Sequence, residues 1–261
     1  MQIKPKKSLG QNFLHDKNII NKIINASNIS ANDEVLEIGP GTGNLTRFII
    51  NQNPKKIYVI EKDFNLSKEL SKKFMNKISI INMDILKISD EFYTGKKFLI
   101  LGNLPYNIST KILSNWCLSK ELKFSKMILM FQKEVADRIL ANVNSKNYSR
   151  ITILSNWKFD IKRIIDVKPS SFFPKPKVHS AVLEFLPKKK IHEIRDPRNL
   201  EKITKIFFNQ RRKMINKPIN ILFKNFHFDY KKFNLHPSDR PQNVDISKYL
   251  KIVNEYEALR N

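Results

Sequence analysis

The stretch E-V-L-E-I-G-P-G-T-G, residues 34–43, joins a short apolar run to a glycine-rich loop. The apolar run has the length and composition of a buried strand. Gly39, Gly41 and Gly43 would let the backbone turn tightly and approach a ligand closely. The loop is not the dinucleotide fingerprint G-x-G-x-x-G, because Asn44 stands at its third glycine position. The stretch therefore predicts a strand that ends in a turn, and the turn could hold a ligand.

Strand-like runs alternate with longer polar segments from residue 33 onward. The runs are 34–39, 56–61, 78–84, 98–103 and 126–132. Helix-compatible segments such as 65–76 and 109–119 lie between them, which is typical of a parallel sheet covered on both faces. Two later runs, 159–167 and 178–186, are joined by a loop too short for a parallel crossover. We therefore predict an α/β fold whose mostly parallel sheet ends in an antiparallel pair.

The strand pattern stops at the basic stretch P-K-K-K, residues 187–190. Segments 199–215 and 249–259 have helical periodicity. Residues 187–261 contain 18 Lys+Arg and 8 Asp+Glu, a larger excess per residue than in the rest of the chain. We predict two domains, the sheet domain at 1–187 and a small all-α domain at 188–261.

The charge of the chain favours a polyanionic partner. The 261 residues include 48 Lys+Arg and 24 Asp+Glu, a net charge of +24, and phosphate neutralisation by such an excess releases counterions. A lysine-rich proteome or an anionic membrane surface would also account for it. No run is long and apolar enough to span a membrane, no basic amphipathic helix stands out, and no secretory signal is visible. With a single cysteine, Cys117, these features predict a cytoplasmic protein that binds nucleic acid and no membrane.

Ligand-binding residue types follow four successive strand-like runs, namely Gly39, Glu61, Asp84 and Asn103. In open parallel sheets, ligands bind outside the carboxyl ends of the strands. Glu61 could accept hydrogen bonds from both hydroxyls of a ribose, and Asp84 could accept one from an adenine amino group. Each acid could equally serve a helix start, as a dipole partner or an N-cap. The series, and not any one member, indicates a nucleoside site.

The fourth run ends in the tetrapeptide N-L-P-Y, residues 103–106. Asn103 offers a side-chain carbonyl, and Pro105 pushes Leu104 into an extended conformation that fixes the direction of its carbonyl. Two acceptors would converge on one amino group, while Tyr106 would offer an aromatic face to a base. Acceptors on both amine hydrogens favour a tetrahedral nitrogen with its lone pair free to attack. The alternative is a strand-to-helix turn with a packed tyrosine.

A second aromatic candidate lies in the loop K-P-S-S-F-F-P-K-P-K-V, residues 168–178. Phe172 or Phe173 could cover the other face of a flipped-out base. Taken alone, either ring is expected to pack in the core.

Several common catalytic motifs are absent from the chain. It contains no H-E-x-x-H, C-x-x-C or G-x-S-x-G pattern. We therefore predict neither a metal site nor a Ser-His-Asp hydrolase.

Five stretches together resemble the ribosomal RNA adenine dimethyltransferases, above all the bacterial small-subunit enzymes. They are S-L-G-Q-N-F-L (8–14), V-L-E-I-G-P-G-T-G-N-L-T (35–46), G-N-L-P-Y-N-I-S-T (102–110), F-F-P-K-P-K-V-H-S-A-V (172–182) and F-N-Q-R-R-K (208–213). The resemblance spans nearly the whole chain and implies S-adenosyl-L-methionine as cofactor. It implies dimethylation at N6 of two adjacent adenosines near the 3′ end of 16S rRNA in the small ribosomal subunit. It also implies a seven-stranded Rossmann-like methyltransferase sheet followed by a helical RNA-binding domain.

The resemblance also implies roles for individual residues. Contacts to the cofactor would come from Asn12 and Leu14 at its methionine end, Gly39 and Gly41 alongside it, Glu61 at the ribose hydroxyls, Asp84 at the adenine amino group, and Asn103. Asn103 and the Leu104 carbonyl would hold the target N6, with the base between Tyr106 and Phe172. The rate enhancement would come from positioning the two reactants and from an electrostatic environment that matches the sulfonium charge as it disperses.

The basic run Arg211, Arg212 and Lys213 favours the small-subunit branch and would bind RNA, although a solvated helix face would look the same. We expect a monomer. Two alternatives remain: a large-subunit rRNA adenine-N6 methyltransferase, and a non-catalytic assembly factor of the small subunit.

Overall fold

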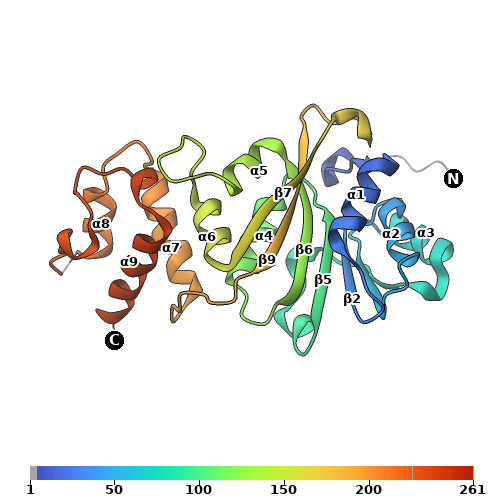
Figure 1. The fold of residues 1–261 in the computed structure, drawn as a ribbon, viewed down its shortest axis with the longest axis horizontal. Coiled ribbons are helices and arrows are strands. Elements are labelled where there is room, and N and C mark those ends of the chain that lie inside the picture. Colours follow the sequence, from blue (N-terminus) through green and yellow to red (C-terminus); the bar gives the residue numbers. More distant parts are fainter. Residues whose placement is uncertain (1–4, 225, 261) are drawn as a thin grey trace. The chain divides into compact units, whose positions relative to one another are not determined.

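The computed structural model describes residues 5–224 and 226–260 and divides the chain into two compact units (Figure 1). The first unit comprises residues 1–136 and 160–187, and the second comprises 137–159 and 188–261. Sequence analysis did not group residues 137–159 with the C-terminal helices. The predicted assignment of catalysis to 1–187 and RNA binding to 188–261 stays a prediction.

A seven-stranded sheet forms the centre of the first unit, in the order β4-β3-β2-β5-β6-β9-β7. Its strands, in chain order, are β2 (Glu34–Ile38), β3 (Lys56–Ile60), β4 (Ser79–Ile81), β5 (Lys97–Asn103), β6 (Lys123–Gln132), β7 (Phe159–Val167) and β9 (Ser180–Pro187). The pairs β2–β3, β3–β4, β2–β5 and β5–β6 are parallel, and β6–β9 is antiparallel. The predicted fold class is confirmed. The run predicted as a strand at 78–84 is shorter, because Asn82 leaves the ladder and donates to the Glu61 carbonyl at 2.8 Å.

The helices around the sheet are α1 (Lys17–Ser27), α2 (Asn44–Ile50), α3 (Phe64–Phe74), α4 (Ser109–Leu118) and α5 (Lys133–Ile139), the last of which crosses into the second unit. Buried side chains of α1, α2 and α3 share one core with alternate residues of the strands, such as Val35, Val59 and Leu101. The intervening strand residues, Leu36 and Ile100 among them, are fully buried on the opposite face. Because both faces are covered, only the strand ends are open to a ligand.

A second, two-stranded sheet joins distant parts of the first unit. Strand β1 (Phe13–Leu14) pairs antiparallel with β8 (Phe172–Phe173). The pairing ties the N-terminal segment, residues 5–14, to the hairpin between β7 and β9.

Short 3-10 helices of the first unit occupy Lys7–Leu9, Met75–Lys77, Ile85–Lys87, Asp90–Tyr93 and Pro169–Ser171.

The second unit is helical, with α6 (Arg150–Lys158), α7 (Pro197–Asn209), α8 (Asn216–Leu222), α9 (Ile246–Ala258) and 3-10 helices at Lys231–Phe233 and Pro241–Asn243. Phe207 of α7 and Tyr249 of α9 are fully buried, with ring centroids 5.2 Å apart. The helix expected over 199–215 ends earlier than predicted, at Asn209. A turn follows in which the Lys213 N–H donates to the Gln210 carbonyl at 2.8 Å.

Candidate active site

The strand register brings the predicted residues to one edge of the sheet. Ile38, the last residue of β2, pairs with Ile60 of β3 and with Gly102 of β5. The residues that follow, Gly39, Glu61 and Asn103, are therefore neighbours at the carboxyl edge. The chain reverses its winding direction here, between β2 and β5, which is where open sheets bind ligands.

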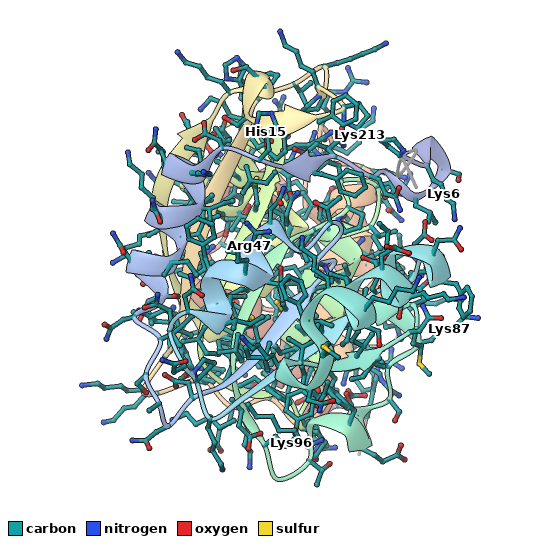
Figure 2. The ribbon with its side chains drawn as sticks, turned by 90° about the vertical axis from the view of Figure 1, so that its right-hand side faces the viewer. Lys6, His15, Arg47, Lys87, Lys96 and Lys213 are labelled. Atoms are coloured by element: carbon teal, nitrogen blue, oxygen red, sulfur yellow. The ribbon has the colours of Figure 1, made fainter. Side chains whose placement is uncertain are left out.

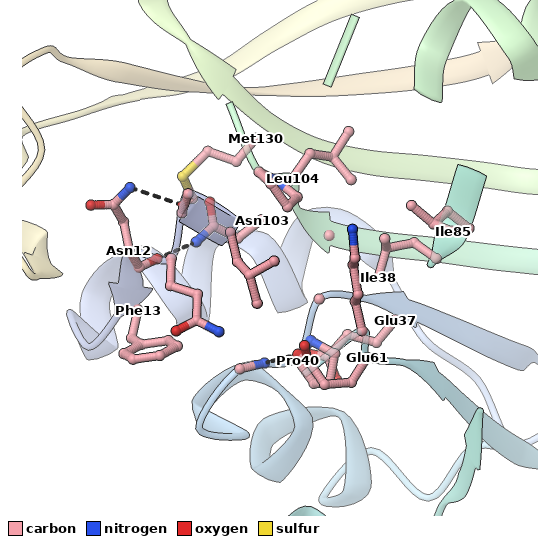
Figure 3. Close-up of a pocket in the computed structure, with 18 of the residues that line it drawn as sticks. Asn12, Phe13, Glu37, Ile38, Pro40, Glu61, Ile85, Asn103, Leu104 and Met130 are labelled. Carbon is pink, nitrogen blue, oxygen red and sulfur yellow. Dashed lines mark hydrogen bonds between the residues drawn. The ribbon is translucent and has the colours of Figure 1, made fainter. Parts of the chain in front are cut away.

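A pocket opens at this edge within the first unit (Figure 3). It is lined by nine of the sequence-predicted residues: Asn12, Leu14, Gly39, Gly41, Glu61, Asp84, Asn103, Leu104 and Tyr106. Phe172 does not line it, and Arg211, Arg212 and Lys213 belong to the other unit. The structure thus brings together the residues expected at the cofactor and at the target amine, apart from Phe172.

The glycine loop is tightly covered at one glycine and leaves space at another. Gly39 and Gly41 both have a left-handed backbone, with φ of 65° and 57°. A Cβ on Gly41 would lie 2.7 Å from the ring of Phe13, whereas one on Gly39 would meet only the Asn103 carbonyl at 3.7 Å. Gly41 is thus closely covered by the N-terminal segment, and Gly39 leaves space in the pocket.

Glu61 is a fixed, almost fully buried acceptor. It is 7% exposed, and its two carboxylate oxygens accept from the backbone N–H groups of Asp63 at 2.8 Å and Gly41 at 3.2 Å. Burial raises the pKa of Glu61, and these backbone hydrogen bonds offset the rise only in part. Each oxygen retains a further lone pair, so the carboxylate can accept from two neighbouring hydroxyls.

Asp84 lies where the wall of the pocket carries both charge and apolar surface. Its carboxylate accepts from the Leu86 N–H at 3.0 Å and pairs with Lys62 at 3.0 Å. Partial burial pushes the pKa of Asp84 up, but the Leu86 and Lys62 contacts outweigh it and the pKa is lowered. Met83 and Ile85, the sequence neighbours of Asp84, also line the pocket and offer apolar contact for a flat ring.

Asn103 is oriented by the N-terminal segment. Its Nδ2 donates to the backbone carbonyl of Asn12 at 2.8 Å. Because this bond fixes the amide orientation, Oδ1 is the atom left as an acceptor. The structure gives neither Oδ1 nor the Leu104 carbonyl a hydrogen-bond partner within the described residues. Two acceptors are therefore available at the end of β5.

Tyr106 is held by a hydrogen bond to strand β9. Its hydroxyl lies 2.5 Å from the hydroxyl of Ser180, which is fully buried at the start of β9. Burial raises the pKa of Tyr106, with the Ser180 hydrogen bond acting against it, so the phenol stays neutral near pH 7. Ser180 pairs across the ladder with Gln132, so a loop tyrosine is tied to a rigid strand.

The N-terminal segment is anchored over the pocket by Asp63, which sequence analysis did not single out. One Asp63 oxygen contacts both Lys6 Nζ at 2.9 Å and Gln11 Nε2 at 3.0 Å. Burial pushes the pKa of Asp63 up, but the contacts of Lys6 and Gln11 outweigh it and the pKa is lowered. Asn44 also donates to the Leu14 carbonyl at 2.8 Å. The segment is therefore fastened at both ends.

The two phenylalanines of the proline-rich loop have opposite environments. Phe172 is 3% exposed and belongs to the core, while Phe173 is 62% exposed. Core packing, the expectation for either ring taken alone, holds for Phe172 and is wrong for Phe173. The role of Phe172 against a bound base stays a prediction.

The basic run that follows α7 combines a structural and an exposed part. Arg211 is half-buried and donates to the Gln242 side chain at 3.1 Å and the Ser145 carbonyl at 3.2 Å. Arg212 and Lys213 are exposed. The expected RNA contacts of all three stay predictions, with Arg211 also bridging two loops of its own unit.

Glu37 is a pocket residue that the sequence reasoning missed. It is 2% exposed, and Thr46 donates to it at 2.6 Å. Burial raises the pKa of Glu37 to about 8, the Thr46 bond lowers it, and the charge of Glu61 raises it further. The sequence did carry a signal for Glu37, because it is an acidic residue inside an otherwise apolar strand-like run.

We expect Glu37→Gln to stabilise the protein in alkaline solution. A carboxyl whose folded pKa is near 8 holds a proton that the unfolded chain, with a pKa near 4.5, has released. Stability is therefore lost as pH rises from about 4.5 to 8, and the loss is complete above that window. Thermal unfolding should show Glu37→Gln several degrees above the wild type at pH 9, with the difference shrinking toward pH 5.

Glu34→Gln, on the same strand but partly exposed and paired with Lys55 at 3.3 Å, is the matched control. A Glu37→Gln variant with the wild-type pH profile would show that Glu37 is ionised in the folded protein.

Within the described residues, no group of three or more His, Cys, Asp or Glu side chains could hold a metal ion. None of the helices described is both long and apolar enough to cross a bilayer.

Comparison with known proteins extends over nearly the whole chain. The family model of the ribosomal RNA adenine dimethylases matches residues 2–258. The chain is 52% identical to ribosomal RNA small subunit methyltransferase A of Pelagibacter ubique over 100% of both chains. It is 38% identical to the protein of that name from Wolbachia sp. subsp. Drosophila simulans, over 98% of this chain and 95% of the relative.

Solved structures agree with this likeness. A dimethyladenosine transferase from Plasmodium falciparum superposes with a TM-score of 0.79 at 30% identity, covering 94% of this chain and 98% of that one. The 23S rRNA methyltransferase ErmE superposes with a TM-score of 0.67 at 22% identity, covering 94% and 100%, and supports the fold alone.

Proposed function

The chain belongs to the ribosomal RNA adenine dimethylase family, and we propose that it transfers methyl groups from S-adenosyl-L-methionine to N6 of two adjacent adenosines near the 3′ end of 16S rRNA in the small ribosomal subunit. The observation that carries the proposal is the placement of Asn103, Leu104 and Tyr106 in one pocket at the switch point of the sheet. Asn103 Oδ1 and the Leu104 carbonyl have no hydrogen-bond partner there among the described residues. A methyltransferase of this family acting on ribosomes would work in the cytoplasm, and we propose that it acts as a monomer.

The pocket fits the cofactor on its own geometry. Glu61 presents a carboxylate fixed by two backbone N–H groups, suited to the ribose hydroxyls. Asp84 offers an acceptor for the adenine amino group, between Met83 and Ile85. Gly39 leaves open the space a Cβ would fill. Asn12 and Leu14 would contact the methionine end, and Gly41 would lie alongside the cofactor.

S-adenosyl-L-methionine would supply the activated methyl group. In the first transfer the protein would hold the two N6 hydrogens of adenine with Asn103 Oδ1 and the Leu104 carbonyl, which would turn the nitrogen lone pair toward the methyl group. Each transfer would release one N6 proton to water, so the second transfer would use the single hydrogen that remains. Tyr106 would stack on the base, and Phe172 would complete the stack only if its ring left the core. Since a sulfonium is a good electrophile, no strong base is needed, and rate would come from positioning and from the match to changing charge.

A transfer experiment separates the three functions considered. Purified protein is incubated with methyl-labelled S-adenosyl-L-methionine and unmethylated 30S subunits, 50S subunits or free 16S rRNA. The proposal predicts label in 30S subunits. Label only in 50S subunits would indicate the large-subunit enzyme, and tight 30S binding without transfer would indicate an assembly factor.

We expect the Ser180–Tyr106 hydrogen bond to contribute to turnover. Ser180→Ala and Tyr106→Phe should each lower kcat by up to about tenfold with little change in the KM for the cofactor, because a single hydrogen bond is lost in each. The double variant should be no slower than either single variant, as measured by a double-mutant cycle on kcat.

Ser27→Ala provides the control, because it removes another buried hydroxyl, bonded to the Ile24 carbonyl at 2.6 Å, on helix α1. If Ser180→Ala lowered thermal stability to the same extent as Ser27→Ala and left kcat unchanged, the bond would be purely structural.

A further inference from the structure

The β1–β8 ribbon presents two distinct faces. Leu14 pairs with Phe172, and Phe13 pairs with Phe173. Residues directly opposite in an antiparallel pair project to the same side, while successive residues alternate. Leu14 and Phe172 are 6% and 3% exposed and join the core. Phe13 and Phe173 therefore share the outer face of the ribbon.

The outer face adjoins the pocket. Phe13 lines the pocket, and its ring covers Gly41. Phe173, its direct partner in the ribbon, is 62% exposed and makes no aromatic ring contact within the described residues. A large, mostly exposed aromatic side chain thus stands next to a residue that lines the pocket.

Lysines flank Phe173 in the sequence. The segment 168–179 contains Lys168, Lys175 and Lys177 and no acid. All three lysines are exposed, and the structure shows no ion pair for them in the part of the chain that it describes.

Two acids next to this segment already have partners. Asp16 caps α1 and accepts from the Ser171 hydroxyl at 2.9 Å. Asp166 pairs with Lys133 at 3.2 Å and Arg163 at 3.0 Å. Figure 2 shows His15, whose N–H donates to the Ser171 carbonyl at 3.0 Å, beside the same hairpin. The segment 168–179 therefore presents exposed lysines that have no acidic partner in the described part of the chain.

We propose that Phe173, Lys175 and Lys177 form a surface that binds the single-stranded RNA next to the target adenosine. Phe173 stacks on a neighbouring base, and the two lysines contact the flanking phosphates. An open aromatic face beside unpaired cations suits single-stranded RNA, since every base has a stacking face and every nucleotide a phosphate. The inference rests on the proposed function and deepens it by assigning recognition of flanking nucleotides to the sheet unit.

The test compares binding and turnover of full-length variants on unmethylated 30S subunits at several salt concentrations. Phe173→Ala should weaken binding about tenfold, in line with the loss of one base stack, without changing the salt dependence. Phe173→Trp should restore binding. Phe64→Ala is the matched control, because Phe64 is 67% exposed in the same unit and does not line the pocket.

The double change Lys175→Ala with Lys177→Ala should make the plot of log affinity against log salt shallower by about 1.5, the loss of two phosphate contacts. Lys22→Ala with Lys68→Ala, on exposed positions of α1 and α3, should leave the slope unchanged. Affinity for S-adenosylhomocysteine, measured by calorimetry without RNA, should be the same in all these variants.

If the wild-type protein is active and Phe173→Ala binds 30S subunits as tightly as Phe64→Ala does, the inference is overturned and the proposed function stands. An unchanged salt slope in the double-lysine variant would show that Lys175 and Lys177 make no phosphate contacts. A wild-type protein that transfers no methyl group to 30S subunits would overturn the proposed function, and this inference with it.

Discussion

Asn103→Ala is expected to lower methyl transfer to 30S subunits on the order of a thousandfold, comparable to deleting one electrostatic contact to a reacting group. The change removes Oδ1, one of the two acceptors that would orient N6. It also removes the Nδ2 bond to the Asn12 carbonyl at 2.8 Å, so we expect a smaller loss of cofactor affinity as well. Binding to 30S subunits should remain largely intact. Single-turnover transfer, cofactor calorimetry and subunit binding measure the three effects separately.

Asn103→Asp separates the two bonds of this side chain. Aspartate keeps an acceptor for N6 but replaces the donor to Asn12 with a second oxygen, which repels the carbonyl. We therefore expect transfer to fall strongly here too. Full activity in Asn103→Asp would show that the Asn12 contact is dispensable, and full activity in Asn103→Ala would remove Asn103 from the mechanism.

Gly43→Ala should destabilise the protein by roughly 2–4 kcal/mol, combining backbone strain with overpacking. Gly43 precedes α2 with φ of 76°. An added Cβ would lie 2.5 Å from the ring of Phe74 and 2.8 Å from Leu70, both buried on α3. The contacted atoms are the ends of two buried side chains that have little room to move, so the packing between α2 and α3 must change. The glycine loop of the pocket would move with it.

Gly95→Ala separates strain from collision. Gly95 has φ of 73°, almost the same as Gly43, but nothing lies within 4 Å of its added Cβ. Chemical denaturation should therefore show a loss of about 1 kcal/mol for Gly95→Ala, from strain alone. Equal losses in the two variants would mean that the packing between α2 and α3 accommodates a methyl group without cost.

Much of the sheet and of the pocket could be predicted because parallel strands align their carboxyl ends. The alternation of apolar runs indicated the order of elements, and Gly39, Glu61 and Asn103 follow strands that are direct neighbours. These residues line one pocket in the structure, and predicting this required no knowledge of contacts between distant segments.

What could not be predicted depends on contacts between distant segments. The β1–β8 pairing joins residues 13–14 to 172–173, and only that pairing decides that Phe172 is buried and Phe173 exposed. Asp63 caps α3, and its contacts to Lys6 and Gln11 join segments that are far apart in the sequence. Arg211 likewise resembles a solvated helix residue until its contacts to Ser145 and Gln242 are seen.

The chemical identity of the product is the most direct measurement. Wild-type protein is incubated with S-adenosyl-L-methionine and unmethylated 30S subunits, and the 16S rRNA is digested with nuclease and analysed by mass spectrometry. We predict N6,N6-dimethyladenosine confined to the adjacent pair of adenosines near the 3′ end. Absence of dimethyladenosine from that pair, with active protein and bound cofactor, would contradict the function assigned to the Asn103–Tyr106 site.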